Sequence, residues 1–257
     1  MRIGGLQKLT LIDYPRRVAC TVFLIGCNFQ CPWCYNPELV LPDPPKFSKR
    51  KLERVKISEK IFFQFLKQRK KLLEGVVVCG GEPTIHKNLP EFIKKIKKFG
   101  YLVKLDTNGS NPEILEKLID NKLIDYVAMD IKAPIGAETQ NAKRKTQNNN
   151  LKLKTKYEQA MGVRINLKDI KKSIEIIKNS GVDYEFRTTV VPGIHTKEDI
   201  IQIAKEISFA KKYFLQNFWP DKTIDLKFEK IKPYSDEWLL EVQKSTVKFC
   251  KNCQIRQ

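Results

Sequence analysis

Short apolar runs alternate along the chain with longer segments in which apolar residues recur every three or four positions. The short runs are rich in β-branched residues and predict strands over residues 18–25, 75–79, 101–106, 126–131, 183–190 and 212–218. The longer segments predict helices over residues 58–73, 89–99, 112–121, 167–180, 197–208 and 235–248. Six consecutive strand–helix units predict an α/β fold, a partial (βα)6 TIM-like barrel with its functional residues at the carboxyl ends of the strands.

Helix-capping residues and a change in composition mark the internal boundaries. Ser58 and Thr196 each precede an acidic first turn, which is typical of a helix start. Residues 136–162 are polar, rich in Lys and Asn, and only weakly periodic. We interpret them as an insertion within one strand–helix unit of a single domain spanning residues 1–257.

Charge and composition narrow the class of protein. The chain has 48 Lys and Arg against 29 Asp and Glu, a net charge of +19 that favours an acidic partner. Because the Lys-rich runs occur throughout the chain, we favour a generally basic surface and rank a nucleic-acid partner last. No run approaches the roughly 18 apolar residues of a membrane span, and no apolar signal segment opens the chain, so we expect a cytoplasmic protein without a membrane partner.

The chemically most distinctive segment, GCNFQCPWCYN, follows the first predicted strand. It places Cys27, Cys31 and Cys34 in a Cys-x3-Cys-x2-Cys array on a polar loop. Cytoplasmic thiols stay reduced, and three thiolates this close in sequence can surround one soft metal centre. A structural zinc site or an electron-transfer [4Fe–4S] cluster uses four protein ligands, so a triplet predicts a centre with one position open to substrate. Three unrelated core cysteines are the alternative, which a polar loop disfavours.

This array resembles the signature of the radical S-adenosylmethionine (SAM) superfamily, which has an aromatic residue before its third cysteine, here Trp33. The resemblance implies that Cys27, Cys31 and Cys34 hold a catalytic [4Fe–4S] cluster. It also implies that S-adenosyl-L-methionine chelates the fourth iron, with Trp33 among the cofactor-binding residues. The fold of that superfamily is a six-unit partial barrel, which agrees with the strand count reached from the hydrophobic pattern.

The second predicted strand ends in CGGEPT, which contains Gly80, Gly81 and Glu82. Consecutive glycines let a backbone pass close to a ligand, and a carboxylate can accept a hydrogen bond from an ammonium group. The segment matches the GGE motif of the superfamily, which contacts the amino group of SAM. The resemblance therefore implies that Gly80, Gly81 and Glu82 bind the cofactor, while a plain turn is the alternative for the glycines.

The next two strands end in DTNG and MDIKAP, which supply Asp106, Thr107, Asn108, Asp130 and Lys132. Charged residues at the ends of buried strands require partners or a ligand. These segments resemble the glycyl-radical enzyme activating enzymes. That resemblance implies a monovalent cation beside Asp106, Thr107 and Asp130, and cofactor contacts from Asp106, Asn108 and Lys132. Capping of a following helix by Asp106 or Asp130 is the alternative.

The fifth strand carries Arg187 within DYEFRTTVVPG, and the guanidinium group of arginine suits a carboxylate. The resemblance implies that Arg187 lies near the carboxylate of SAM. The sixth strand reads FLQNFWP and lacks the histidine that some activating enzymes stack on the cofactor. The adenine contact therefore stays open, and pyruvate formate-lyase is disfavoured as the target.

The sequence says little about the roles of the two histidines and of the four cysteines outside the array. We interpret His195 as a turn residue, whereas His86 follows GGEPT and its role stays open. The lone Cys-x2-Cys at Cys250 and Cys253 has no second pair, so chance spacing is favoured over a redox pair or half of a metal site. Two further cysteines are expected in the core, Cys20 and Cys79.

The resemblance extends over nearly the whole chain and narrows to the activating proteins of anaerobic ribonucleoside-triphosphate reductase, through residues 5–40, 183–193 and 208–257. It implies reductive cleavage of SAM to a 5′-deoxyadenosyl radical that generates a glycyl radical on the large reductase subunit, with a flavodoxin or ferredoxin-type reductant. Activation of another glycyl-radical enzyme is one alternative. A small-molecule radical SAM enzyme, such as a 7-carboxy-7-deazaguanine synthase-like protein, is another.

Overall fold

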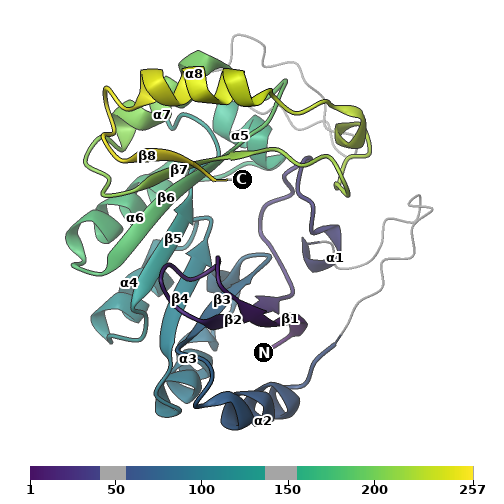
Figure 1. Cartoon of the computed structure of the whole chain (residues 1–257), viewed down its shortest axis with the longest axis vertical. Helices are drawn as coiled ribbons and strands as arrows, with labels where there is room; N and C mark the ends of the chain where they lie inside the picture. Colours follow the sequence, from purple (N-terminus) through teal and green to yellow (C-terminus); the bar gives the residue numbers. More distant parts are fainter. Residues whose placement is uncertain (41–55, 137–154, 257) are drawn as a thin grey trace. The chain divides into compact units, whose positions relative to one another are not determined.

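The computed structural model describes residues 1–40, 56–136 and 155–256. Strands and helices alternate along this part of the chain (Figure 1). The strands are β1 (Ile3–Thr10), β2 (Ala19–Leu24), β3 (Gly75–Gly80), β4 (Leu102–Thr107), β5 (Tyr126–Asp130), β6 (Asp183–Val190), β7 (Tyr213–Asn217) and β8 (Cys253–Arg256), and their order in the sheet follows the chain. The six predicted strands are confirmed as β2 to β7, each end within one residue of its expected place, whereas β1 and β8 were not predicted.

The six predicted helices are also confirmed, as α2, α3, α4, α6, α7 and α8. The full set is α1 (Pro37–Val40), α2 (Glu59–Arg69), α3 (Leu89–Lys98), α4 (Pro112–Asp120), α5 (Lys156–Met161), α6 (Leu167–Asn179), α7 (Lys197–Glu206) and α8 (Asp236–Thr246), with short 3-10 helices η1 (Pro83–Ile85) and η2 (Phe228–Lys230). Ser58 caps α2 through its hydroxyl, and Thr196 forms a capping box with Asp199 at the start of α7. Both predicted helix starts are thus explained by side-chain acceptors for otherwise unsatisfied backbone N–H groups.

The described residues form two compact units. The first unit comprises Met1–Asn28, Asn36–Ala128 and Lys172–Asp183, and the second comprises Phe29–Tyr35, Met129–Lys171 and Tyr184–Gln257. The chain therefore passes from one unit to the other within the loop that carries the cysteine array, after Asn28.

The sheet of the first unit combines parallel and antiparallel pairing. Strands β2, β3 and β4 are parallel, with Ala19 opposite Gly75 and Gly75 opposite Leu102. Parallel neighbours need a long connection. The predicted helix α2 connects β2 to β3, and the predicted helix α3 connects β3 to β4. Strand β1 instead pairs antiparallel with β2, from Ile3 opposite Leu24 to Thr10 opposite Ala19.

Aromatic packing dominates the helical layer of the first unit. Phe62 of α2 and Phe92 of α3 are buried and stack with ring centroids 5.5 Å apart. Burial of side chains of this size stabilises a fold by about 1.5–3 kcal/mol each. A further cluster contains Tyr14, Val77 and Tyr126, with the two tyrosine rings 6.0 Å apart.

The sheet of the second unit ends in the C-terminal strand. Strands β6, β7 and β8 are parallel, and Gln216 of β7 lies opposite Arg256 of β8. Arg256 donates to both carboxylate oxygens of the fully buried Glu185, at 2.8 and 3.1 Å, and its guanidinium lies 3.9 Å from the Phe214 ring centroid. Helix α8 packs against α7, β7 and β8. The last residues of the described chain are thereby tied to the core of this unit.

The Lys/Asn-rich stretch of residues 136–162 contains one described helix. Residues 137–154 lie outside the described residues, whereas α5 follows them directly. Thr155 and Glu158 form a capping box at its start, and Gly162 ends it with a φ of +68°. The end of this stretch is therefore an ordered helix with defined caps.

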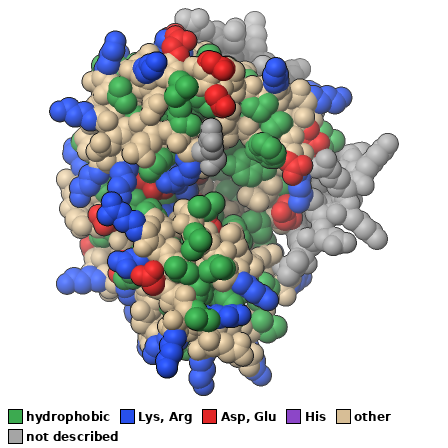
Figure 2. Space-filling model, viewed as in Figure 1, with side chains coloured by type: hydrophobic (Ala, Val, Ile, Leu, Met, Phe, Trp, Pro, Cys, Tyr) green, Lys and Arg blue, Asp and Glu red, His purple; other side chains and the backbone are tan. Residues whose placement is uncertain are grey.

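Neither the described helices nor the surface in view is strongly apolar. Of the described helices, none has the length and apolar character needed to cross a membrane. On the face drawn in Figure 2, Lys and Arg side chains are distributed over the surface, with Asp and Glu side chains among them.

Candidate functional site

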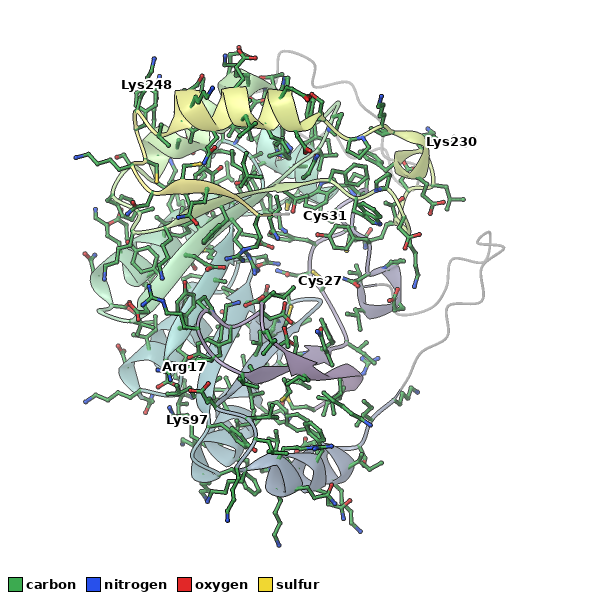
Figure 3. The ribbon with its side chains drawn as sticks, in the orientation of Figure 1. Arg17, Cys27, Cys31, Lys97, Lys230 and Lys248 are labelled. Atoms are coloured by element: carbon green, nitrogen blue, oxygen red, sulfur yellow. The ribbon has the colours of Figure 1, made fainter. Side chains whose placement is uncertain are left out.

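The cysteine array lies on the loop between β2 and α1, where Figure 3 marks Cys27 and Cys31. Cys31 is buried, with 8% of its surface exposed, whereas Cys27 and Cys34 are half-buried. None of the seven cysteines forms a disulfide bond. The array thus lies on a loop after β2, as the sequence predicts, with one buried thiol and two half-buried thiols.

Backbone hydrogen bonds hold the part of this loop that belongs to the second unit. The N–H of Cys34 donates to the Cys31 carbonyl at 3.0 Å, and the Cys34 carbonyl accepts from Ile224 at 3.1 Å. The Pro32 carbonyl accepts from Asp225 at 2.9 Å. Because the loop backbone is held at several points, it presents its cysteines in a defined conformation.

In the first unit, two glycines let the β3 end pass close to β2. A Cβ on Gly80 would lie 2.2 Å from the Leu24 nitrogen, and φ at Gly80 is +134°. A Cβ on Gly81 would lie 2.0 Å from the Gly26 carbonyl oxygen and 3.1 Å from the Cys27 Cβ. No side chain fits at these distances. The glycines are required for this close approach, and they bring the GGE segment against the residue before Cys27.

Glu82 is fully buried in the first unit and accepts four hydrogen bonds. Its Oε1 accepts from the Thr84 N–H at 3.0 Å, the Thr84 hydroxyl at 2.5 Å and the Thr107 hydroxyl at 2.7 Å, and its Oε2 accepts from the Asn108 N–H at 2.6 Å. Burial raises the pKa of this carboxyl above its ordinary value, in spite of these bonds. A carboxylate oxygen has about two acceptor positions. Among the described residues Oε1 is fully used, whereas Oε2 can still accept from a cationic donor.

Asn28 joins the cysteine loop to the same hydrogen-bond network. Its side-chain oxygen accepts from the Asn108 amide at 3.1 Å, and its own amide donates to the Ser110 hydroxyl at 2.8 Å. Glu82 also donates its backbone N–H to the Gly26 carbonyl at 2.7 Å. The structure therefore brings together Glu82, Asn108 and Asn28, the residue after Cys27, and no sequence motif marks Asn28 as part of this network.

Asp106 and Thr107 point to opposite faces of β4, because neighbouring residues of a strand alternate. Thr107 reaches Glu82, whereas Asp106 forms an ion pair with the fully buried Lys104. The helix that follows is capped by Asn111, so the capping alternative for Asp106 is wrong.

Asp130 lies between two cations in the second unit. Its Oδ2 accepts from Lys132 Nζ at 2.7 Å and its Oδ1 accepts from Arg187 Nε at 2.9 Å. Burial acts to raise the pKa of Asp130, but Arg187 and Lys132 outweigh it and hold that pKa well below its usual range. Burial likewise acts to lower the pKa of Lys132, yet the negative charge of Asp130 outweighs it and raises that pKa above its ordinary value. All three groups are charged at neutral pH and carry a net charge of +1, which suits a carboxylate ligand. Residues 131–136 are not helical, so no helix begins directly after Asp130 and its capping alternative is also wrong.

Trp33 and Lys132 are neighbours in this unit. The Lys132 ammonium lies 5.1 Å from the Trp33 ring centroid, a distance at which a cation is attracted to an indole face. The Trp33 indole N–H donates to the Ala160 carbonyl at 3.2 Å. The aromatic residue before the third cysteine is thus fixed from two sides.

The donor set of this chain suits an iron–sulfur cluster of the expected kind. Among the residues that the structure describes, no three or more His, Cys, Asp or Glu side chains converge closely enough to hold a single metal ion. A four-iron cluster is bound at separate corners, so its cysteines need not meet at one point. Two half-buried thiols and one buried thiol on a single loop offer three separate ligands to such a group. A monovalent cation at Asp106, Thr107 and Asp130 stays a prediction.

The two histidines have different environments. His195 follows a turn, as expected, but its ring is buried: Nδ1 accepts from the Val191 N–H at 3.0 Å, so Nε2 carries the proton and donates to the Lys132 carbonyl at 2.8 Å. Burial lowers the pKa of His195 to about 4. His86 is half-buried, and burial lowers its pKa as well. His195 is a neutral ring that positions the backbone of Lys132.

Of the four cysteines outside the array, three are buried and Cys79 is half-buried. Cys20 is fully buried, and burial raises its pKa to about 12, which confirms it as a core residue. Cys79 packs against the Tyr14 and Val77 cluster. Cys250 and Cys253 are both buried, and burial raises the pKa of each thiol, to about 12 for Cys253. Thiols with raised pKa values are poor nucleophiles and ligands at neutral pH.

Comparisons with known proteins identify the family of this chain. Residues 21–207 match the family model of the radical SAM superfamily. A protein of Methanocaldococcus jannaschii, whose name assigns it to the glycyl-radical enzyme activating enzymes, is 34% identical over 255 residues, which is 99% of this chain and 95% of that protein. A 7-carboxy-7-deazaguanine synthase of Aquifex aeolicus is 38% identical over 87 residues, 34% of each protein.

A solved structure shows the same fold. SuiB of Streptococcus suis bound to S-adenosylmethionine aligns with a TM-score of 0.61 at 16% sequence identity, covering 91% of this chain and 49% of SuiB. The likeness confirms the predicted fold class. With its cysteine array, its GGE segment and a family match over most of its length, this chain belongs to the radical SAM superfamily.

Proposed function

We propose that this protein is a radical SAM activase that generates a glycyl radical on the large subunit of anaerobic ribonucleoside-triphosphate reductase. The observation that carries the proposal is the 34% identity, over 99% of the chain, to a protein named as a glycyl-radical enzyme activating enzyme. The reductase is chosen among glycyl-radical enzymes because of the sequence resemblance in residues 5–40, 183–193 and 208–257.

The residues of the chain suit binding of the cofactors. In this proposal Cys27, Cys31 and Cys34 hold three irons of a [4Fe–4S] cluster, and the loop backbone fixes their positions. Glu82, in the first unit, keeps an acceptor position at Oε2 for an ammonium group. In the second unit, the Lys132 and Arg187 cations exceed the single charge of Asp130 and favour a carboxylate. When bound, the reduced cluster and SAM supply the reductive cleavage that leads to hydrogen abstraction from a glycine.

A small-molecule radical SAM enzyme is the second candidate. Its support is the 38% identity to a 7-carboxy-7-deazaguanine synthase, which covers only 34% of the chain. We favour the activase because its support extends over the whole chain. Conversion of a tetrahydropterin substrate by the purified protein would favour the second candidate instead.

Electron paramagnetic resonance tests the proposal directly. The anaerobically reconstituted and reduced protein is mixed with SAM and the reductase of the same organism, with flavodoxin or ferredoxin as an alternative reductant. We expect a glycyl-radical doublet on the reductase that needs SAM. We expect Cys31→Ala to abolish the doublet. The matched control is Cys250→Ala, which removes a buried cysteine outside the array and should retain the doublet. Formation of 5′-deoxyadenosine without a doublet would refute the reductase as target while retaining the radical chemistry.

The high net charge suggests how the two proteins meet. A protein with a charge of +19 is attracted to an acidic surface, and this attraction is screened by salt. We therefore expect the activation rate to fall as ionic strength rises. A rate independent of salt would argue against docking on an acidic reductase surface.

A further inference from the structure

Helix α5 lies against the part of the cysteine loop that belongs to the second unit. The Gln30 N–H donates to the Met161 carbonyl at 3.0 Å, and the Trp33 indole donates to the Ala160 carbonyl at 3.2 Å. The Met161 Sδ lies 3.8 Å from the Cys31 Sγ, and both side chains are buried. The carbonyl end of one short helix therefore meets the loop on both sides of Cys31.

Gly162 makes this close approach possible. It ends α5 with a φ of +68°, and its N–H donates to the Glu158 carbonyl at 2.9 Å. A Cβ at this position would lie 2.5 Å from the Gln30 carbonyl oxygen, which is backbone and has no flexible end to move aside. A side chain here must push the helix and the loop apart.

We infer that α5 is a positioning element for the iron–sulfur cluster, in which Gly162 sets the distance to the loop and Met161 covers the Cys31 sulfur with an apolar thioether. The inference rests on the proposed cluster at Cys27, Cys31 and Cys34. Groups around a metal ligand orient it, and the polarity and hydrogen bonds around a ligand sulfur change the reduction potential of the cluster.

The first test compares two glycines with nearly the same backbone. Gly181 has a φ of +72°, and a Cβ there would meet nothing within 4 Å, so Gly181→Ala carries the conformational strain of Gly162→Ala without the collision. Iron release to a chelator is measured in the reconstituted proteins. We expect Gly162→Ala to lose iron roughly 10- to 100-fold faster than wild type, and Gly181→Ala to match wild type. Equal rates in the two variants would overturn the inference.

The second test concerns Met161. Met161→Leu keeps an apolar side chain beside the Cys31 sulfur, whereas Met161→Gln places an amide donor there. Because hydrogen bonds to a ligand sulfur stabilise the reduced cluster, we expect the midpoint potential to rise in Met161→Gln and to stay at the wild-type value in Met161→Leu. The same potential in both variants would contradict a role of Met161 at the sulfur.

A measurement without the cluster separates this inference from the proposed function. Alkylation of Cys31 by iodoacetamide, followed by mass spectrometry of the cluster-free protein, reports access to the thiol. We expect slow alkylation of Cys31 in wild type and Gly181→Ala and faster alkylation in Gly162→Ala. If wild type fails to bind a cluster yet shows this pattern, the proposed function is refuted and the contact stands. Equal alkylation in all three refutes the contact itself.

Discussion

Replacement of Glu82 by alanine removes the acceptor on which four donors converge in the first unit. Two of these donors are hydroxyls, which can rotate to new partners, and two are the fixed backbone N–H groups of Thr84 and Asn108. A buried N–H left without an acceptor costs about 1–3 kcal/mol, so the two together cost about 2–6 kcal/mol. Loss of a buried charge offsets part of this, since burial already raises the Glu82 pKa. We expect Glu82→Ala to lower the free energy of unfolding by about 2–4 kcal/mol.

The assay is urea unfolding of the protein without cluster or SAM, combined with hydrogen exchange at the Asn108 amide. Thr107→Val is the matched control, because it removes one of three donors to Oε1 and keeps the carboxylate. We expect this control to cost about 0.5–1.5 kcal/mol and to leave the Asn108 amide protected. Equal losses in the two variants, or a Glu82→Ala protein as stable as wild type, would refute the reasoning. If it holds, loss of activity in a Glu82 variant does not by itself demonstrate a lost cofactor contact.

Three further perturbations test other parts of the structure. Arg256→Met leaves the buried Glu185 carboxylate without its bidentate partner; because Arg256 is 27% exposed, we expect a loss of about 2–4 kcal/mol in urea unfolding. Adding Glu185→Gln should recover part of that loss, and additive losses would contradict the pairing. Gly81→Ala places a Cβ 2.0 Å from the Gly26 oxygen, so a melting temperature equal to that of wild type would be inconsistent with the structure. The pKa of His195 is lowered from 6.5 to about 4. The unfolded state therefore binds more protons between these two values, and stability falls as the pH is lowered across that window, by roughly 3 kcal/mol in total. His195→Gln should flatten this pH dependence in urea unfolding, and an unchanged slope would show that the stability change arises elsewhere.

The hydrophobic pattern predicted the repeated strand–helix units closely, and the reasons for the omissions are physical. Strand β1 (Ile3–Thr10) contains two glycines and polar residues and is buried only at its two ends, so its alternation is weak. Strand β8 (Cys253–Arg256) has four residues, too few for a periodic signal. Helix α5 has six residues within a Lys/Asn-rich stretch, but its capping box, Thr155 followed three residues later by Glu158, was a readable signal.

The candidate site was predictable where it depends on strand ends and less so where it depends on tertiary contacts. The rule that functional residues follow parallel strands correctly brought Glu82 and Asn108 together. Strand alternation places the side chains of Asp106 and Thr107 on opposite faces of β4, so the two side chains cannot both point to one bound cation. The roles of Asn28 and Met161 depend on which distant segment each one meets, and no local pattern encodes that.

The capping box at the start of α5 has a consequence for how this protein varies between species. Thr155 and Glu158 satisfy the first backbone N–H groups of the helix from within the helix itself. These reciprocal bonds hold the first turn of a helix whose other end contacts the loop beside Cys31. We therefore expect related proteins to keep a capping pair at these two positions, Ser or Thr followed three residues later by Glu or Gln.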